Sequence, residues 1–436
     1  MVLGGGMLAA GVLDYGVSVA AGRKLGPAEF GVFVSVSALL QVLLAVATAI
    51  RMVVAFYTAE LSAAREHGAA IGAFLRRAAR WCSVRGVVAM AAMAVATPVL
   101  GRAFRLPTPW PLRAAGLMVM MLFIREAALG ALQGIQAFTG LAVVQVSQAV
   151  LRLGFAVALI AAGAGAAGAI AAQPIAAVGA VAIAAWWLRP YLVSGTGVLG
   201  SGPGALGPGA PGSGAPGRPV SWSYSAATVI GLALFGVLTN LDALFVKLAF
   251  TPRVAGDYGT VVTFEKINLF LPFAVSFVLF PKAVRRHAAG QDARPILLLA
   301  LVAAMAPGLG LTVLYAAAPG VVVRTVFTDA YADPGVVLAL ATLAATLQSG
   351  VNIWLNYALS TARSGFLYVL GAAVLWQGGG MLLLGRESLT RMALVMVAAA
   401  LAANLGGYLT TWAPARGRGA VGAGRDPALA GGRAAG

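Results

Sequence analysis

The chain has 436 residues, of which 60% are hydrophobic and only 10% are charged, and its formal net charge is +17. A soluble domain has about 45–50% apolar and about 25% charged residues, so this composition predicts a chain embedded in a lipid bilayer. The single cysteine, Cys82, excludes internal disulfides and a cysteine-rich metal site. Lysine and arginine are scattered between apolar runs, which argues against a nucleic-acid-binding patch.

Apolar segments long enough to cross a hydrocarbon core of roughly 30 Å as helices recur along the chain. We predict twelve of them, near residues 2–22, 31–59, 84–101, 113–136, 141–163, 168–188, 224–248, 258–280, 295–318, 335–359, 365–385 and 389–412. The first lacks the basic region and cleavage site of a signal peptide, so we interpret it as a spanning helix. The arginine-rich stretch 65–85 is predicted to lie along the inner leaflet. The predicted fold is all-α, a polytopic membrane protein.

A segment rich in glycine, proline and serine divides the spans into six and six. The predicted domains are an N-terminal six-helix lobe (1–190), a flexible cytoplasmic linker (191–221), a C-terminal six-helix lobe (222–413) and a disordered cytoplasmic tail (414–436). Lysine and arginine are more frequent in the loops on the side of the two termini. This bias predicts a multi-pass protein of the cell inner (plasma) membrane with both termini cytoplasmic.

The two halves carry an internal repeat. Pro27 and Pro252 lie 225 residues apart, as do Gly140 and Gly365, and the aromatic-glycine pairs 30–31 and 258–259 lie 228 apart. Because each half has an even number of spans, both insert the same way up. The repeats are therefore parallel and related by a pseudo-two-fold axis along the membrane normal, an arrangement typical of transporters with a site between the halves.

Three motifs carry a resemblance to a known family: "RKLGPAEFGVF" after the first span, "TNLDALFVKLAFTPRVAGDYG" at the seventh, and "LFPKAVRRH" at the end of the eighth. The chain resembles the polysaccharide-biosynthesis (Wzx-type) flippases of the multidrug/oligosaccharidyl-lipid/polysaccharide (MOP) exporter superfamily. The resemblance implies two six-helix lobes around a central cavity and movement of a lipid-linked sugar from the inner to the outer leaflet. The peptidoglycan-precursor branch generally has fourteen helices, so a count of twelve argues against it.

Polar residues recur at helical spacing within the apolar spans, where lipid cannot satisfy them. We predict that they face a hydrated cavity; the alternative is that they hydrogen-bond neighbouring helices. The arginines of the N-terminal half exceed its buried acids by one charge, and an anionic pyrophosphate would balance that surplus. The candidate substrate-binding residues are Arg51, Arg125, Arg152, Gln145, Gln148, Gln348, Asn352, Asn356 and Lys266.

Four carboxylates within the spans are candidates for coupling to a proton or sodium ion: Asp14, Asp242, Glu265 and Glu126. The alternative, weighed equally, is that they only form salt bridges, with Lys266 or Arg51 as the partners of the outer carboxylates. Lys247 is predicted to extend to the outer surface. No catalytic residue, metal site or cofactor is predicted beyond the coupling ion.

The sequence leaves three functions open. The first is a flippase for undecaprenyl-pyrophosphate-linked oligosaccharide, ion-gradient coupled and working by alternating access. The second is a cation-coupled multidrug exporter of the same superfamily, for which an acidic cavity is expected. The third is a membrane sugar polymerase or ligase, which would need a large extramembrane loop. The first predicts a non-enzymatic protein that is monomeric, with lipid-linked oligosaccharide, membrane lipid and glycan polymerase or ligase machinery as partners and no nucleic acid.

Overall fold

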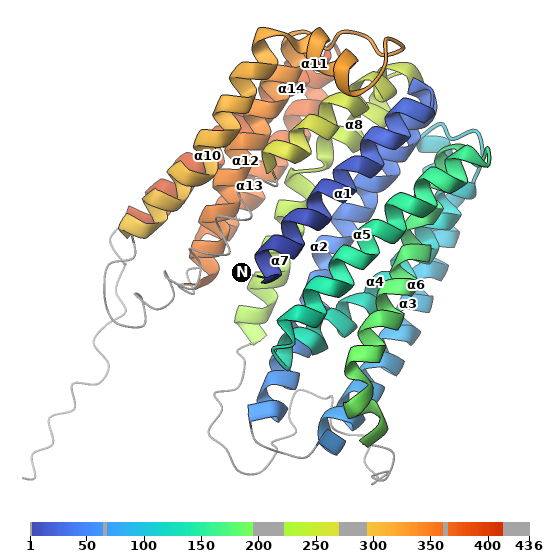
Figure 1. Cartoon of the computed structure of the whole chain (residues 1–436). Helices are drawn as coiled ribbons and strands as arrows, with labels where there is room; N and C mark the ends of the chain where they lie inside the picture. The colour runs from blue at the N-terminus through green and yellow to red at the C-terminus, as the bar shows by residue number, and fades with distance from the viewer. Residues whose placement is uncertain (1, 64–67, 195–221, 270–293, 361–364, 413–436) are drawn as a thin grey trace, which may run out of the picture.

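The computed structural model describes residues 2–63, 68–194, 222–269, 294–360 and 365–412, and every regular element in them is a helix (Figure 1). The predicted all-α fold is confirmed. The elements are α1 (Val2–Lys24), α2 (Pro27–Ala63), α3 (Gly68–Ala103), α4 (Trp110–Gly134), α5 (Phe138–Ala161), α6 (Gly165–Ser194), α7 (Trp222–Leu238), α8 (Leu241–Ala249), a helix over residues 252–269, α10 (Arg294–Ala317), α11 (Pro319–Val326), α12 (Val336–Ser360), α13 (Gly365–Gly380), the π-helix η1 (Met381–Gly385) and α14 (Leu389–Trp412).

The helices that can cross a bilayer follow the predicted spans. In the described residues, 10 helices are long and apolar enough on their own, and α7 with α8 forms one more span that is bent by 45°. The remaining predicted span begins in the helix 252–269, and its continuation lies outside the described residues. Residues 68–85, which were predicted to lie along the inner leaflet, form the first half of α3, since their alanines and arginines are strong helix formers. They are continuous with the following span, and their position relative to the leaflet stays a prediction.

The packing of the helices repeats in the two halves and produces two lobes (Figure 1). In the N-terminal half α1 packs on α5, α3 on α4, and α4 and α5 on α6. The C-terminal half repeats these pairs as α7 on α13, α10 on α12, and α12 and α13 on α14. The predicted linker and tail fall mostly on residues 195–221 and 413–436, outside the described residues. The domain boundaries therefore stay predictions.

The lobes meet backbone to backbone at one end of the bundle. A Cβ atom added to Gly256 would lie 1.7 Å from the Pro27 carbonyl oxygen, and one added to Gly31 would lie 2.8 Å from the Gly256 nitrogen. Such separations are far below van der Waals contact, so only glycine permits this approach of α2 to the helix 252–269. The repeated Pro–Gly motifs of the sequence therefore form the crossing point of the two lobes.

Aromatic packing and hydrogen bonds close the same end. Phe30 of α2 contacts Phe327 and Tyr331, whose ring centroids lie 5.6 and 5.8 Å from its own. The Tyr331 hydroxyl donates to the Gly22 carbonyl at 2.6 Å, and Arg23 donates to the carbonyls of Thr325 and Val326 at the end of α11. We call this region, formed by residues 22–33, 249–258 and 325–335, the sealed end; it lies at the top of Figure 1, where the ribbons of the lobes converge.

Candidate functional site

The seventh span breaks where a continuous helix was predicted over residues 224–248. The break is at Thr239 and Asn240, whose side chains turn back onto α7: Thr239 Oγ1 donates to the Phe235 carbonyl at 2.9 Å, and Asn240 Nδ2 donates to the Gly236 carbonyl at 2.8 Å. Short polar side chains compete with the backbone in this way and disfavour helix continuation. An apolar segment that reads as one continuous span therefore contains the end of one helix and the start of the next.

The carbonyl groups freed by the break receive donors from three other helices. Leu238 O accepts from Gln348 Nε2 of α12 at 3.3 Å and from Gln377 Nε2 of α13 at 2.9 Å. Lys266 Nζ donates to Thr239 O at 3.2 Å and to Asn240 Oδ1 at 2.8 Å. Irregular backbone is tolerated at membrane depth only where protein or water satisfies it. Gln348 and Lys266, both candidate substrate-binding residues, are therefore drawn together around the broken helix.

Three buried acidic groups form what we call the carboxyl cluster: Asp242, Tyr258 and Glu265. The Tyr258 hydroxyl lies 3.0 Å from Asp242 Oδ2 and 3.2 Å from Glu265 Oε1, and all three side chains are buried. One hydroxyl proton can be donated to only one carboxyl group. Both contacts are hydrogen bonds only if the other carboxyl is protonated and donates to the phenol oxygen. Within the described residues neither carboxyl makes an ion pair with Lys266 or Arg51.

A second cluster, which we call the arginine cluster, lies in the N-terminal lobe between α1, α2, α4 and α5. Glu126 is fully buried and lies between two arginines. Its Oε2 accepts from Arg51 Nη2 at 2.6 Å and from Arg51 Nε at 2.7 Å, and its Oε1 accepts from Arg125 Nη1 at 2.5 Å. Arg125 Nε donates to Gln148 Oε1 at 2.6 Å. Four of the predicted site residues thus form one network.

Arg152 and Asp14 complete the arginine cluster. Arg152 Nη1 donates to Asp14 Oδ1 at 2.9 Å, and both side chains lie within electrostatic reach of Arg125. The helix of Arg152, α5, contains no acid, and the partner of Arg152 comes from α1 instead. Within the described residues the buried Arg152 Nε and Gln145 Nε2 have no hydrogen-bond partner. With three arginines and two carboxylates, the cluster keeps one positive charge that no carboxylate balances.

The remaining predicted site residues are not brought to either cluster. Asn356 Nδ2 donates to the backbone carbonyl and to Oδ1 of Asn352, one turn before it on α12, and these are the hydrogen bonds that the described residues give this pair. Asn268 of the helix 252–269 instead binds α10 and α12, donating to Thr312 Oγ1 and Thr346 Oγ1. Some of the polar residues within the spans therefore hydrogen-bond their own or neighbouring helices, as the alternative interpretation predicted, and do not line a shared site.

Gln377 is a polar contact of the broken helix that we did not predict. It is fully buried on α13 and lies 225 residues after Arg152, the same separation that relates Gly140 to Gly365. Applying the repeat register to Arg152 would have found it. A second correction concerns Lys247, which does not reach the surface: its side chain is 2% exposed and its Nζ has no hydrogen-bond partner.

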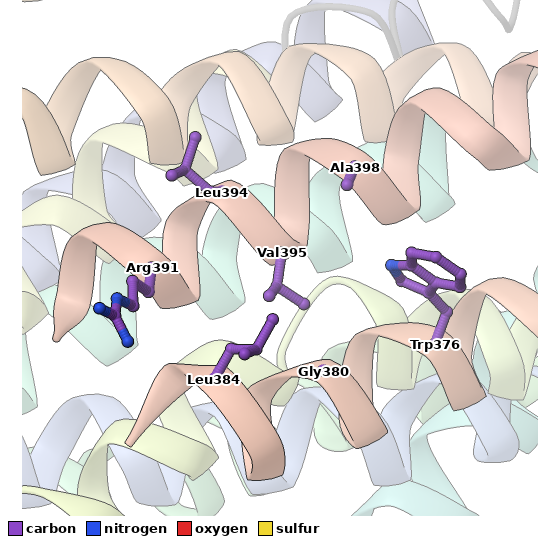
Figure 2. Close-up of a pocket in the computed structure, with 7 residues that line it drawn as sticks. All are labelled: Trp376, Gly380, Leu384, Arg391, Leu394, Val395 and Ala398. Carbon is purple, nitrogen blue, oxygen red and sulfur yellow. The ribbon is translucent and has the colours of Figure 1, made fainter. Parts of the chain in front are cut away.

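The surface of the C-terminal lobe also carries an apolar groove of about 420 Å³ between α13, η1 and α14 (Figure 2). Its lining includes Trp376, Leu384 and Leu394, with Arg391 at one end. These side chains are exposed on the outside of the bundle and belong to neither cluster. Within the described residues no group of three or more His, Cys, Asp or Glu side chains could hold a metal ion.

Comparison with known proteins gives the fold a context. No family model matches the sequence, and no curated protein matches it. Solved structures do match over nearly the whole chain. A MATE-family multidrug transporter of the MOP superfamily in an inward-facing conformation has a TM-score of 0.68 at 13% identity, covering 92% of this chain and 93% of the other.

The lipid II flippase MurJ in an inward closed conformation has a TM-score of 0.69 at 10% identity, covering 94% and 87% of the two chains. A MATE-family transporter of the MOP superfamily in an outward-facing conformation gives 0.55 at 14% identity, covering 94% and 92%. The structural neighbours are therefore MATE and MurJ transporters of the MOP superfamily, and this chain shares their fold, with two lobes and about twelve spans. They include both a drug exporter and a lipid flippase, so the fold alone does not select the substrate.

Proposed function

We propose that this protein is a lipid-linked oligosaccharide flippase of the Wzx type, which translocates an undecaprenyl-pyrophosphate-linked sugar from the inner to the outer leaflet and is driven by an ion gradient. The observation that carries the proposal is the unbalanced positive charge of the arginine cluster. A buried charge costs roughly 2.5–3.5 kcal/mol at the helix centre on insertion scales, so a surplus cation in the membrane indicates a functional site.

The geometry of the arginine cluster suits a phosphate group. Arg152 uses Nη1 for Asp14, while its Nε is left without a partner. Arg51 uses Nε and Nη2 for Glu126, which leaves Nη1 free of that carboxylate. Guanidinium groups bind phosphate oxygens with paired N–H donors. A diphosphate held between these free edges would neutralise the surplus.

We assign ion coupling to the carboxyl cluster. Of the four predicted coupling carboxylates, Asp14 and Glu126 each form an ion pair with arginine and are structural partners of it. Within the described residues Asp242 and Glu265 have no arginine partner, and both can hydrogen-bond Tyr258 when they share one proton. Loss of that proton would leave two buried carboxylates in contact with a single hydroxyl donor. Repulsion between them would destabilise this conformation and favour the opposite one of the transport cycle.

The sealed end is proposed to be the outer face. The sealed end lies at the end of the bundle opposite both termini. The lysine and arginine bias of the loops predicts cytoplasmic termini, so the sealed end would face outward. The two larger TM-scores belong to structures described as inward-facing or inward closed, which supports the same orientation. The protein would act in the plasma membrane as a monomer, without a cofactor, and pass its product to glycan polymerase or ligase machinery.

A cation-coupled multidrug exporter is the second candidate, and the carboxyl cluster favours it. When Asp242 and Glu265 release the proton that they share, their two charges against that of Lys266 leave one net negative charge, which would attract a cationic drug. A third candidate, a membrane sugar polymerase or ligase, has the least support, since the structural neighbours are transporters. Export of a fluorescent cation by the purified protein in vesicles, with no flipping of a lipid-linked diphosphate, would select the exporter.

The test of the proposal is flipping of a labelled lipid-linked oligosaccharide in proteoliposomes. Arg152→Ala should lose activity by at least tenfold, while Arg152→Lys should keep part of it, since the charge remains and the fork is lost. Because Arg152 forms an ion pair with Asp14, Arg152→Ala leaves Asp14 without its arginine partner. Because the Asp14 side chain is 42% exposed and can be hydrated, the loss of stability should be modest.

A matched variant separates binding from structure. Asp14→Asn combined with Arg152→Gln removes both charges of the ion pair and keeps a polar side chain at each position. If Arg152 only holds α5 to α1, this double variant should flip the substrate at nearly the normal rate. If Arg152 holds the diphosphate, the double variant should be as inactive as Arg152→Ala. Full activity of both variants at normal protein levels would overturn the assignment.

A further inference from the structure

Lys247 is a buried cation that has no ion-pair partner among the described residues. Its side chain is 2% exposed, and no described residue hydrogen-bonds its Nζ. Another cation, Arg105, lies within electrostatic reach of it. An unpaired ammonium at this depth is costly, and replacing such a charge by an apolar group of similar size is normally stabilising. A buried lysine that destabilises this conformation is expected to have a function in another conformation of the protein.

The surroundings place the Lys247 ammonium between the lobes at the sealed end. Lys247 lies in the last turn of α8, a C-lobe helix that packs against α2 of the N lobe. Arg105 belongs to the α3–α4 loop of the N lobe, and its Nη1 reaches the Phe250 carbonyl just beyond α8, at 3.5 Å. Its backbone is in the left-handed region, with φ of 49°, which a non-glycine residue rarely adopts. The loop thus holds Arg105 in one defined place over the end of α8.

The loop that holds Arg105 adds only positive charge to this place. The stretch from Arg102 to Arg113 contains three arginines and no acid. The sealed end also carries four carboxylates, Glu29, Asp257, Asp329 and Asp333. Glu29 accepts from the Ala166 amide at 3.1 Å, Asp257 from the Ala332 amide at 3.1 Å and Asp333 from the Gly335 amide at 2.9 Å. Within the described residues none of the four forms an ion pair with Lys247. The position therefore complements an anion.

From these observations we infer that Lys247, with Arg105 beside it, is a second binding site for the substrate's phosphate group, closed here and exposed when the lobes part at the sealed end. This inference rests on the proposed function, which makes the sealed end the exit for a lipid-linked diphosphate. The arginine cluster receives the anion while the opposite side is open, and Lys247 receives it on the exit side. Because the site is buried in this conformation, the anion cannot return to it before the lobes open again.

Amine modification tests whether Lys247 becomes exposed and binds phosphate. The chain has four lysines, so peptide mapping after a short pulse of a water-soluble acylating reagent reports each one separately. Lys24 is exposed at the same end and serves as the internal reference. Gly256→Ala places a methyl group against the Pro27 carbonyl and should force the sealed end apart. In lipid nanodiscs this variant should be acylated at Lys247 at least tenfold faster than the wild type, with Lys24 unchanged.

Inorganic pyrophosphate is the probe for binding. At millimolar concentration it should slow acylation of Lys247 in Gly256→Ala at least threefold and leave Lys24 unaffected, whereas sodium chloride of equal ionic strength should not. If Gly256→Ala does not fold, Gly31→Ala introduces a milder clash at the same crossing. Folded variants in which Lys247 stays unreactive, or reacts without protection by pyrophosphate, would overturn the inference.

Substitution of Lys247 links the site to transport. Lys247→Met should raise the melting temperature, because it removes an unpaired buried charge, and should lower flipping of the lipid-linked oligosaccharide at least tenfold. Lys247→Arg should stay within about threefold of the wild type, since it keeps a phosphate-binding cation. Lys24→Met is the control and should change neither quantity.

The outcomes separate this inference from the proposed function. Protection of Lys247 by pyrophosphate in a protein that flips no lipid-linked diphosphate would keep the anion site and reject the flippase. Flipping that survives Lys247→Met unchanged would keep the flippase and reject the exit site.

Discussion

The two lobes use the same helix contact for opposite chemistry. In the N lobe α1 packs on α5, and the contact carries the Asp14–Arg152 ion pair. In the C lobe α7 packs on α13, and the residue 225 positions after Arg152 is Gln377, which donates to the Leu238 carbonyl. The repeat therefore preserves the backbone arrangement. At equivalent positions the arginine of the N lobe is replaced by the amide of Gln377, and the continuous helix α1 is replaced by the broken span of α7 and α8.

The difference indicates a division of labour. In the arginine cluster each carboxylate forms an ion pair with a guanidinium, which fixes its position. In the carboxyl cluster two acids share one hydroxyl, and the nearby Lys266 donates to a carbonyl of the helix break. In the function we propose, the N lobe holds the substrate's phosphate with a fixed positive surplus, and the C lobe changes its charge with the coupling ion. Three measurements test this contrast.

The largest effect is expected from removing the carboxylate that organises the arginine cluster. Glu126→Gln leaves Arg51 and Arg125 buried side by side without a counter-charge. Breaking a buried ion pair from one side typically costs about 3–5 kcal/mol, so the melting temperature of the purified protein should fall sharply. The exposed pair Glu387–Arg391 provides the control, since Glu387→Gln should change stability little. Equal, small effects of both substitutions would show that the arginine cluster is hydrated and not a buried network.

Neutralising one acid of the carboxyl cluster should affect transport much more than stability. Asp242→Asn keeps the volume of the side chain and makes it neutral. The hydrogen bonds with Tyr258 already require one of the two carboxyls to be protonated, so a neutral group at this position fits the cluster. We expect the melting temperature to stay close to the wild-type value while flipping loses its dependence on the proton or sodium gradient. A collapse of stability comparable with Glu126→Gln would mean that both acids are ionised in the fold. Unchanged gradient dependence in Asp242→Asn and Glu265→Gln would leave them as helix-pairing residues.

Hydropathy predicted the spans well because burial of apolar side chains in lipid depends on composition, which is local in sequence. The break at Thr239–Asn240 was missed for the opposite reason: the carbonyls of Leu238 and Thr239 that it frees accept from side chains of other helices, which are distant in sequence. Partner choice is likewise non-local. Arg51 and Arg125 share Glu126, and Arg152 finds Asp14 138 residues away, pairings that helical periodicity cannot distinguish.

The smallest effect is expected at the sealed end. Tyr331→Phe removes the hydroxyl that donates to Gly22 O, and a hydrogen bond of this kind contributes about 0.5–1.5 kcal/mol. Burial, and then the nearby Asp257 carboxylate, raise the pKa of Tyr331. A raised pKa in the folded state means that the contribution is complete below the unfolded value of about 10 and is lost as the pH rises through the folded value.

The difference in melting temperature between wild type and Tyr331→Phe should therefore be constant from pH 6 to 9 and shrink in stronger alkali. Tyr368→Phe, at a side chain that is 80% exposed, is the control and should show no such difference. A gap that persists unchanged above the folded pKa would mean that the hydroxyl contributes through packing alone.

The length of α2 has a mechanical consequence. Its 37 residues make a rod of about 55 Å, nearly twice the hydrocarbon thickness of about 30 Å. The rod meets the C lobe twice: at Gly31 in its first turn, against the helix 252–269, and farther along at Val42 and Ala45, against Gly236 of α7. A tilt of about 10° about the Gly31 crossing would displace the far tip of the rod by about 8 Å and the contact with α7 by about 3 Å. A stroke of that size therefore leaves the glycine crossing in place and requires α2 to repack against α7.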